Sequence, residues 1–433
     1  MNMDHLSLPT WLLGVWDRLR SSFWFLPSTM AAGAAALSFA LVWLDTSLED
    51  GAIERLGWLY GFGPEGARAV LSAVAGSMIT VAGLTFSMTM LTLQLASSQF
   101  GPRLLRSFMS DRGNQLVLGT FTSTFLYCLL VLRTVRGTEE ASFVPHISVT
   151  FGVVLATLSL AVLIYFIHHI ANSIRIETVL AELARETQAA IDRLYPTQLG
   201  QEPSPRDAHA PAGLLRELEA DPLAVFIQGS GYVQRLDEEA VMRIATEHDL
   251  LVSVDTPPGR FVTERDAVLR AAPRARASDE VLDLLREAFV VGSDRTPTQD
   301  LHFSLRRFVE IAQRALSPGI NDPTTALYCI DRLEQALCAL AEREFPSPVR
   351  ADEQGRPRVI TPVSSLQDFA CPALAAIARY GMNDADVVRQ LVAATAALAA
   401  RAGPGAREAL RSLGAAIEAE SRSTLRAFDG GRG

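Results

Sequence analysis

The sequence contains no lysine, and this absence removes two kinds of chemistry. All 39 of its basic residues are arginines. The chain therefore offers neither the amine that forms a Schiff base nor the phosphate-binding lysine of a P-loop. It also has no GxSxG nucleophile motif, no HExxH zinc motif and no glycine-rich phosphate loop. The sequence predicts a protein that is not an enzyme, although a catalytic site assembled from scattered residues stays open.

Cysteine is scarce as well. The four cysteines are Cys128, Cys329, Cys338 and Cys371, and no two of them stand at CxxC spacing. This pattern indicates neither a disulfide framework nor a structural zinc site, and it fits a reducing compartment. We predict no metal and no cofactor.

Acidic residues outnumber basic ones, and apolar residues are abundant. The chain has 48 acidic and 39 basic residues, a formal net charge of -9, which argues against a nucleic-acid partner. Hydrophobic residues make up 49% of the chain, yet charged residues still reach 20%. Almost all long apolar runs lie before residue 170. The composition therefore predicts a very apolar region followed by an ordinary soluble one.

Four apolar runs are long enough to cross a bilayer, which needs roughly 20 residues of helix. No aspartate or glutamate lies within them, which argues against the proton or cation relay of a coupled transporter. The predicted spans are residues 23–44, 69–96, 114–132 and 148–167.

The charges between the spans predict an orientation. The loop between spans two and three carries Arg103, Arg106 and Arg112 and should face the cytoplasm, whereas the loop after span one is acidic. Arg133 and Arg136 weaken this bias, because they follow span three. Since four spans return the chain to its starting side, we expect both termini to be cytoplasmic.

Span two is more polar than its neighbours. Five of its residues fall within a narrow arc at about 100° per residue: Gly76, Thr80, Gly83, Ser87 and Gln94. One interpretation is helix packing, because small residues spaced four apart let helices approach closely. The other is a pore-lining face, because uncharged polar groups can face water around the axis of an oligomer.

Beyond the spans the chain changes character, and we predict four parts. A four-span domain (1–175) is followed by a helix and polar linker (176–211). Short β-like runs then indicate a small mixed α/β or β-rich module (212–275), and helical periodicity indicates a helical cytoplasmic domain (276–433). The predicted fold is membrane α-helical, with four transmembrane helices followed by a cytoplasmic α+β domain that is mostly helical.

Polar residues gather around a predicted helical hairpin in the last part. Asp322 and Pro323 have the residue types of an N-cap and a first helical position. Asp300, Arg306, Asn321 and Asp322 are candidate ligand-pocket residues, although turn and salt-bridge roles explain the same residue types.

Four stretches together resemble a known family: FWFLPS at 23–28, SSQFGPRLLRSFMSDRGNQLVLGTF at 97–121, FIHHIANSIR at 166–175 and ALSPGINDPTTALYCIDRL at 315–333. They resemble the bacterial membrane-protein family labelled as domain of unknown function 2254. The resemblance covers most of the chain. It implies an inner-membrane protein with the same layout and supplies no activity and no functional residues.

We therefore hold two hypotheses of function. The first is a homo-oligomeric channel, whose pore is lined by span two and whose cytoplasmic domain serves assembly or gating. Its expected partners are the lipid bilayer, further copies of the same chain and inorganic ions. The alternative is a membrane-anchored scaffold or signalling protein that binds a partner or ligand through its cytoplasmic domain.

Overall fold

A computed structural model describes residues 24–47, 63–100, 111–138, 141–173, 175–195, 216 and 218–430. The chain forms two compact units, Met1–Arg175 and Ile176–Gly433.

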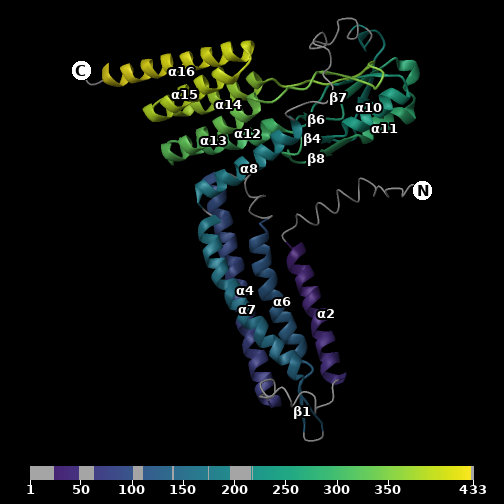
Figure 1. Cartoon of the computed structure of the whole chain (residues 1–433), viewed down its shortest axis with the longest axis vertical. Coiled ribbons are helices and arrows are strands. Elements are labelled where there is room, and N and C mark those ends of the chain that lie inside the picture. Colours follow the sequence, from purple (N-terminus) through teal and green to yellow (C-terminus); the bar gives the residue numbers. More distant parts are fainter. Residues whose placement is uncertain are drawn as a thin grey trace. The chain divides into compact units, whose positions relative to one another are not determined.

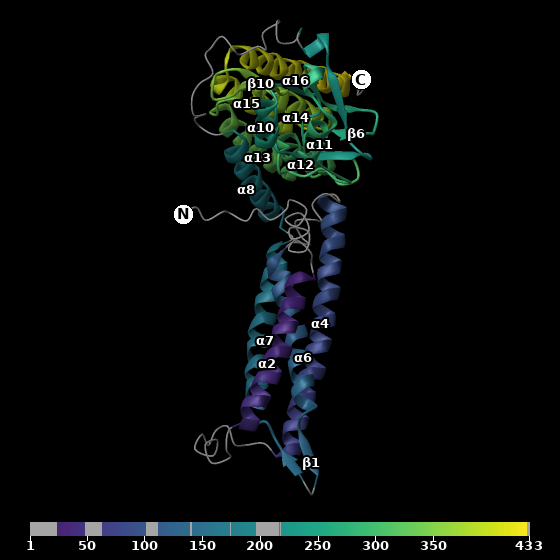
Figure 2. The same cartoon turned by 90° about the vertical axis from the view of Figure 1, so that its right-hand side faces the viewer.

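The first unit is built from four helices that run side by side (Figures 1 and 2). All four are long and apolar enough to cross a membrane, as the sequence predicts. Helix α6 packs against the three others, and half of its most apolar stretch is buried. A short antiparallel hairpin connects α6 to α7. The elements are α2 (Phe25–Ser47), α4 (Pro64–Phe100), α6 (Arg112–Leu132), β1 (Arg136–Thr138), β2 (Ala141–Phe143) and α7 (His146–Ser173).

Two of these helices extend past the predicted spans and carry an acidic residue in the added part. Helix α2 runs on to Ser47 and includes Asp45, which is buried. Helix α4 starts at Pro64 and carries Glu65 in its first turn. The apolar pattern marks where side chains meet lipid, whereas a helix ends where its backbone hydrogen bonds end.

The second unit begins with helix α8 (Ile176–Leu194) and then forms two sheets and two helices. The five-stranded sheet has the order β3-β7-β5-β10-β9, and the three-stranded sheet has the order β6-β4-β8. Buried residues such as Val233, Val252 and Leu269 join the sheets to α10 and α11 in one core. The elements before α12 are β3 (Leu223–Phe226), β4 (Gly231–Leu236), α10 (Glu238–Glu247), β5 (Leu251–Val254), β6 (Phe261–Val262), β7 (Ala267–Ala272), α11 (Asp279–Glu287) and β8 (Phe289–Gly292).

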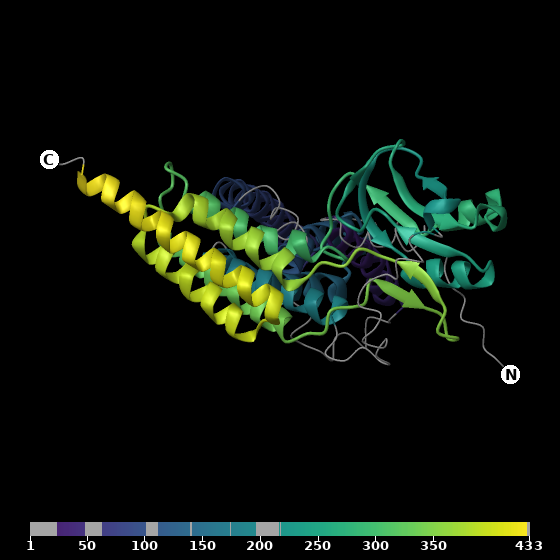
Figure 3. The same cartoon turned by 90° about the horizontal axis from the view of Figure 1, so that it is seen from above.

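Five helices make up most of the remaining chain, side by side at one end of this unit (Figure 3). The predicted hairpin is confirmed, since Asp322 caps the second of them and Pro323 occupies its first turn. Side-chain caps also start the first, third and fourth helices, at Asp300, Ser365 and Asp384. The helices are α12 (Leu301–Ala315), α13 (Pro323–Ala341), α14 (Leu366–Gly381), α15 (Ala385–Arg401) and α16 (Pro404–Gly430).

A β-hairpin interrupts the helices and links them to the sheets. Strands β9 (Val349–Ala351) and β10 (Pro357–Ile360) lie between α13 and α14 in sequence. Strand β10 pairs in parallel with β5, so the hairpin completes a sheet whose other three strands come from residues 223–272. Figure 3 shows this hairpin extending from the helices to the sheets.

Candidate functional site

The five predicted pore-lining residues all lie on an exposed face of α4. Gly76, Thr80, Gly83, Ser87 and Gln94 are exposed. A Cβ atom built on Gly76 or Gly83 would meet nothing within 4 Å. The hydroxyls of Thr80 and Ser87 donate to carbonyls one turn back, those of Gly76 and Gly83, each at 2.9 Å. The stripe therefore does not pack against the other three helices of the first unit.

The opposite side of α4 carries a second row of polar residues, which the sequence does not distinguish from the exposed stripe. Thr85, Thr89 and Thr92 are buried, on the side where α4 packs against α6 and α7. Each threonine donates back to the carbonyl four residues earlier. Because these hydroxyls are satisfied within α4, this row supports packing among the helices of the first unit.

Asp45 joins two helices that are far apart in sequence. Its carboxylate accepts hydrogen bonds from the amides of Ile147 and Ser148, at 2.9 and 3.0 Å, and from the Ser148 hydroxyl at 2.6 Å. These amides lie in the first turn of α7, where backbone donors lack partners within the helix and a negative charge is favourable. With 6% of its surface exposed, Asp45 acts as a cap supplied by another helix.

A second carboxylate joins the start of α6 to the end of α7. Asp111 caps α6 by accepting from the Gly113 amide, and its other oxygen lies 2.7 Å from Nε2 of His169. The His169 ring stacks on Tyr165. A Cβ on Gly113 would come within 2.6 Å of Nε2 of His169, so the imidazole ring would have to shift if this residue had a side chain. Helix α7 is thus held by a carboxylate at each end.

In the second unit, Asp300 belongs to a buried ion pair. It caps α12 through the Phe303 amide, and both Nε and a terminal nitrogen of Arg295 donate to its other oxygen. The guanidinium of Arg295 also lies over the Phe303 ring. Gly259, at φ +93°, brings backbone against this carboxylate, since a Cβ there would meet an Asp300 oxygen at 2.1 Å.

The structure does not bring the four candidate pocket residues together. Asp300 caps the start of α12, and Arg306 lies within that helix and pairs with Glu310. Asn321 and Asp322 lie in the turn beyond the other end of that helix. Asn321 takes a left-handed backbone conformation (φ +49°), and Asp322 accepts from the amide and hydroxyl of Thr325. Among the described residues, no group of three or more His, Cys, Asp or Glu side chains is placed to hold a metal ion.

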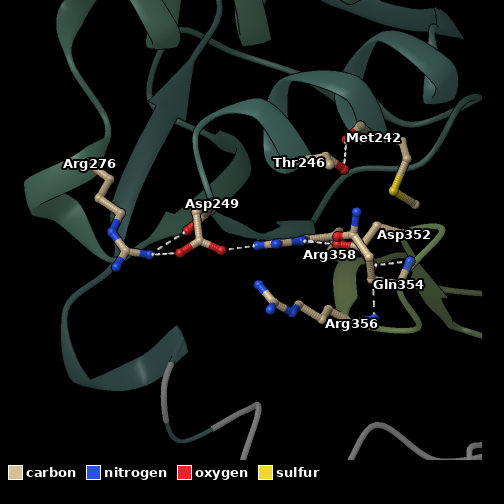
Figure 4. A network of polar contacts seen from close by, with 8 residues as sticks. All are labelled: Met242, Thr246, Asp249, Arg276, Asp352, Gln354, Arg356 and Arg358. Atoms are coloured by element: carbon tan, nitrogen blue, oxygen red, sulfur yellow. Dashed lines mark hydrogen bonds and ion pairs between the residues drawn. The ribbon is translucent and has the colours of Figure 1, made fainter.

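The sequence does not predict the ion-pair network around Arg358, which is shown in Figure 4. This β10 side chain is 8% exposed and donates to Asp352 of its own hairpin and to Asp249 of the α10–β5 turn, at 2.8 and 2.6 Å. Arg276 also pairs with Asp249. The hydrogen bond from Arg358 lowers the pKa of both carboxyl groups. The network fastens the inserted hairpin to the sheet that it completes.

Known proteins share sequence similarity with most of this chain. A family described as predicted membrane proteins, DUF2254, matches residues 20–397. The chain belongs to the DUF2254 family. Two uncharacterized proteins, one of Mycobacterium bovis and one of Mycobacterium tuberculosis, are each 34% identical to it over 389 residues. Each alignment covers 88% of this chain and 73% of the relative. No solved structure matches the chain.

The region matched by the DUF2254 family contains both carboxylate contacts of α7, the exposed stripe of α4 and the Arg358 network. Helix α16 lies beyond it. This DUF2254 member is therefore a membrane protein with four apolar helices followed by a mostly helical region with strands.

The position of His302 in the second unit of this DUF2254 protein disfavours its protonation. Its Nε2 lies 3.0 Å from the Ser364 hydroxyl, and its ring lies against Phe369. Burial lowers its pKa, although the charge of nearby Asp300 acts in the opposite direction. The unfolded chain therefore binds a proton at a higher pH than the folded one. The stability that depends on neutral His302 is complete above about pH 6.5 and is lost as the pH falls further.

We expect His302→Gln to reduce the loss of thermal stability between pH 7.5 and pH 5.5, because glutamine does not titrate. The measurement is the melting temperature of the purified full-length protein at both pH values. His248→Gln, in the same unit, is the matched control and should keep the wild-type difference. An unchanged pH dependence in His302→Gln would show that other groups cause it.

Proposed function

We propose that this protein is a homo-oligomeric channel of the bacterial inner membrane, with the exposed face of α4 lining a pore for inorganic ions. In this proposal both termini are cytoplasmic, and the second unit serves assembly or gating. The observation that carries the proposal is the outward orientation of Gly76, Thr80, Gly83, Ser87 and Gln94.

The lipid environment argues for a partner on this face. A side-chain amide such as that of Gln94 is costly in contact with lipid tails, and the packing inside the protomer already uses the opposite face of α4. The glycines let neighbouring helices come close. Copies of α4 gathered around an axis would turn the hydroxyls and the amide toward water, as uncharged pore linings do.

Ion flux tests the proposal. We expect purified protein in liposomes to give discrete single-channel currents, and Gln94→Leu to lower the conductance by about half or more, because it replaces a polar lining group with an apolar one. The matched control is Thr157→Val. Thr157 is an α7 hydroxyl outside the stripe that donates to the carbonyl of Val153.

Two results would count against a pore lined by α4. One is the absence of current across voltage, pH and membrane tension. The other is an equal loss of conductance in Gln94→Leu and Thr157→Val. Absence of current would favour the scaffold hypothesis. The next measurement would then be ligand or partner binding by the second unit, compared with variants in which Asn321 and Asp322 are replaced.

A further inference from the structure

Helix α8 is an integral part of the second unit. Its buried residues include Leu180, Leu183, Thr187 and Ile191, on the side that packs against α12 and α13. At its end, the Tyr195 ring packs against Phe345 and Phe369. This burial fixes α8 among the helices of the unit.

Ion pairs add to this packing. A terminal nitrogen of Arg307 in α12 lies 2.6 Å from a carboxylate oxygen of Glu186, and the Arg307 side chain is only 7% exposed. Removing one partner of a largely buried ion pair is destabilising, so this contact helps to hold α8 to α12. Two further bonds tie the end of α8: Arg343 pairs with Asp192, and Arg193 donates to the carbonyl of Thr298.

The same helix follows α7 almost directly. Helix α7 ends at Ser173, and the Arg175 amide still donates to the Asn172 carbonyl, at 3.3 Å. Only residues 174 and 175 separate α7 from α8. The chain between α8 and the last turn of α7 is therefore short. That turn contains His169, whose bond to Asp111 fastens it to the start of α6.

We propose that the Glu186–Arg307 pair is a coupling contact, through which the second unit controls the last turn of α7 and the first turn of α6. The coupling runs through the covalent chain and needs no other contact between the two units. Its role in gating rests on the proposed channel function, whereas the coupling itself can be measured without ion flux. If the pair is a coupling contact, a change in α8 must also change the last turn of α7 and the first turn of α6.

Hydrogen exchange of the full-length protein in lipid nanodiscs tests the coupling. We expect Glu186→Gln to speed amide exchange about tenfold in α8, and also in residues 169–173 of α7 and 112–115 of α6. The matched control is Glu182→Gln on the same helix. Glu182 pairs with Arg185 within α8 and is half exposed, so its replacement should leave all three segments unchanged.

Faster exchange confined to α8, or no change in α8, would overturn the proposal. If Glu186→Gln does not fold, Glu186→Asp keeps the charge but shortens its reach, and the same three segments are compared. Flux measured in parallel separates the two proposals. If exchange becomes faster in all three segments but the wild-type protein gives no current, the channel proposal fails and the coupling contact stands. If the wild-type protein gives current but the three segments do not respond together, the coupling contact fails and the channel proposal stands.

Discussion

Replacing Asp45 with alanine is expected to lower the free energy of unfolding of the first unit by about 3 kcal/mol, because three donors lose a charged acceptor and α7 loses its cap. Unfolding of the purified protein in mixed micelles with increasing sodium dodecyl sulfate, followed by circular dichroism, measures the change.

Ser148→Ala is the matched control for this experiment. It removes one of the three hydrogen bonds and leaves both amides of α7 bound to Asp45. We expect it to cost about 1 kcal/mol. If Asp45→Ala is no more destabilising than Ser148→Ala, the carboxylate does not cap α7 in the membrane.

Gly259→Ala is expected to destabilise the second unit by about 3 kcal/mol, from two effects that add. An alanine at φ +93° costs about 1 to 2 kcal/mol in backbone strain. The new Cβ would also displace an Asp300 oxygen, which weakens the pair with Arg295 and the cap of α12. Thermal unfolding of the full-length protein measures the loss.

Gly355→Ala separates the two effects. Gly355 has φ +77°, but a Cβ there would meet nothing within 4 Å. Its replacement should therefore cost only the backbone strain, about 1 kcal/mol. Equal losses at Gly259 and Gly355 would mean that Asp300 moves aside freely, and the ion pair would then contribute little.

Local signals account for what the sequence predicts well. Apolar runs of about 20 residues identify the four long helices, because a helix in lipid must satisfy its backbone bonds internally. The residue pair Asp322–Pro323 identifies the start of α13, because a cap and a first-turn proline act within four residues. Neither inference depends on where the rest of the chain lies.

The features that the sequence does not predict join distant residues. Asp45 binds an amide 102 positions away, and Arg358 binds a carboxylate 109 positions away. No local pattern marks either partner. Strands β9 and β10 have three and four residues, and β10 carries the charged Arg358, so their alternation is too short to stand out from a helical region.

The contacts of α2 have a consequence for how the protein is made. Its main packing partners are α6 and α7, which are synthesised later. The first amide that donates to Asp45 lies 102 residues further along the chain. At ribosomal speed that distance corresponds to roughly 5 to 20 s. During this interval the nascent first helix carries an unpaired carboxylate at its end.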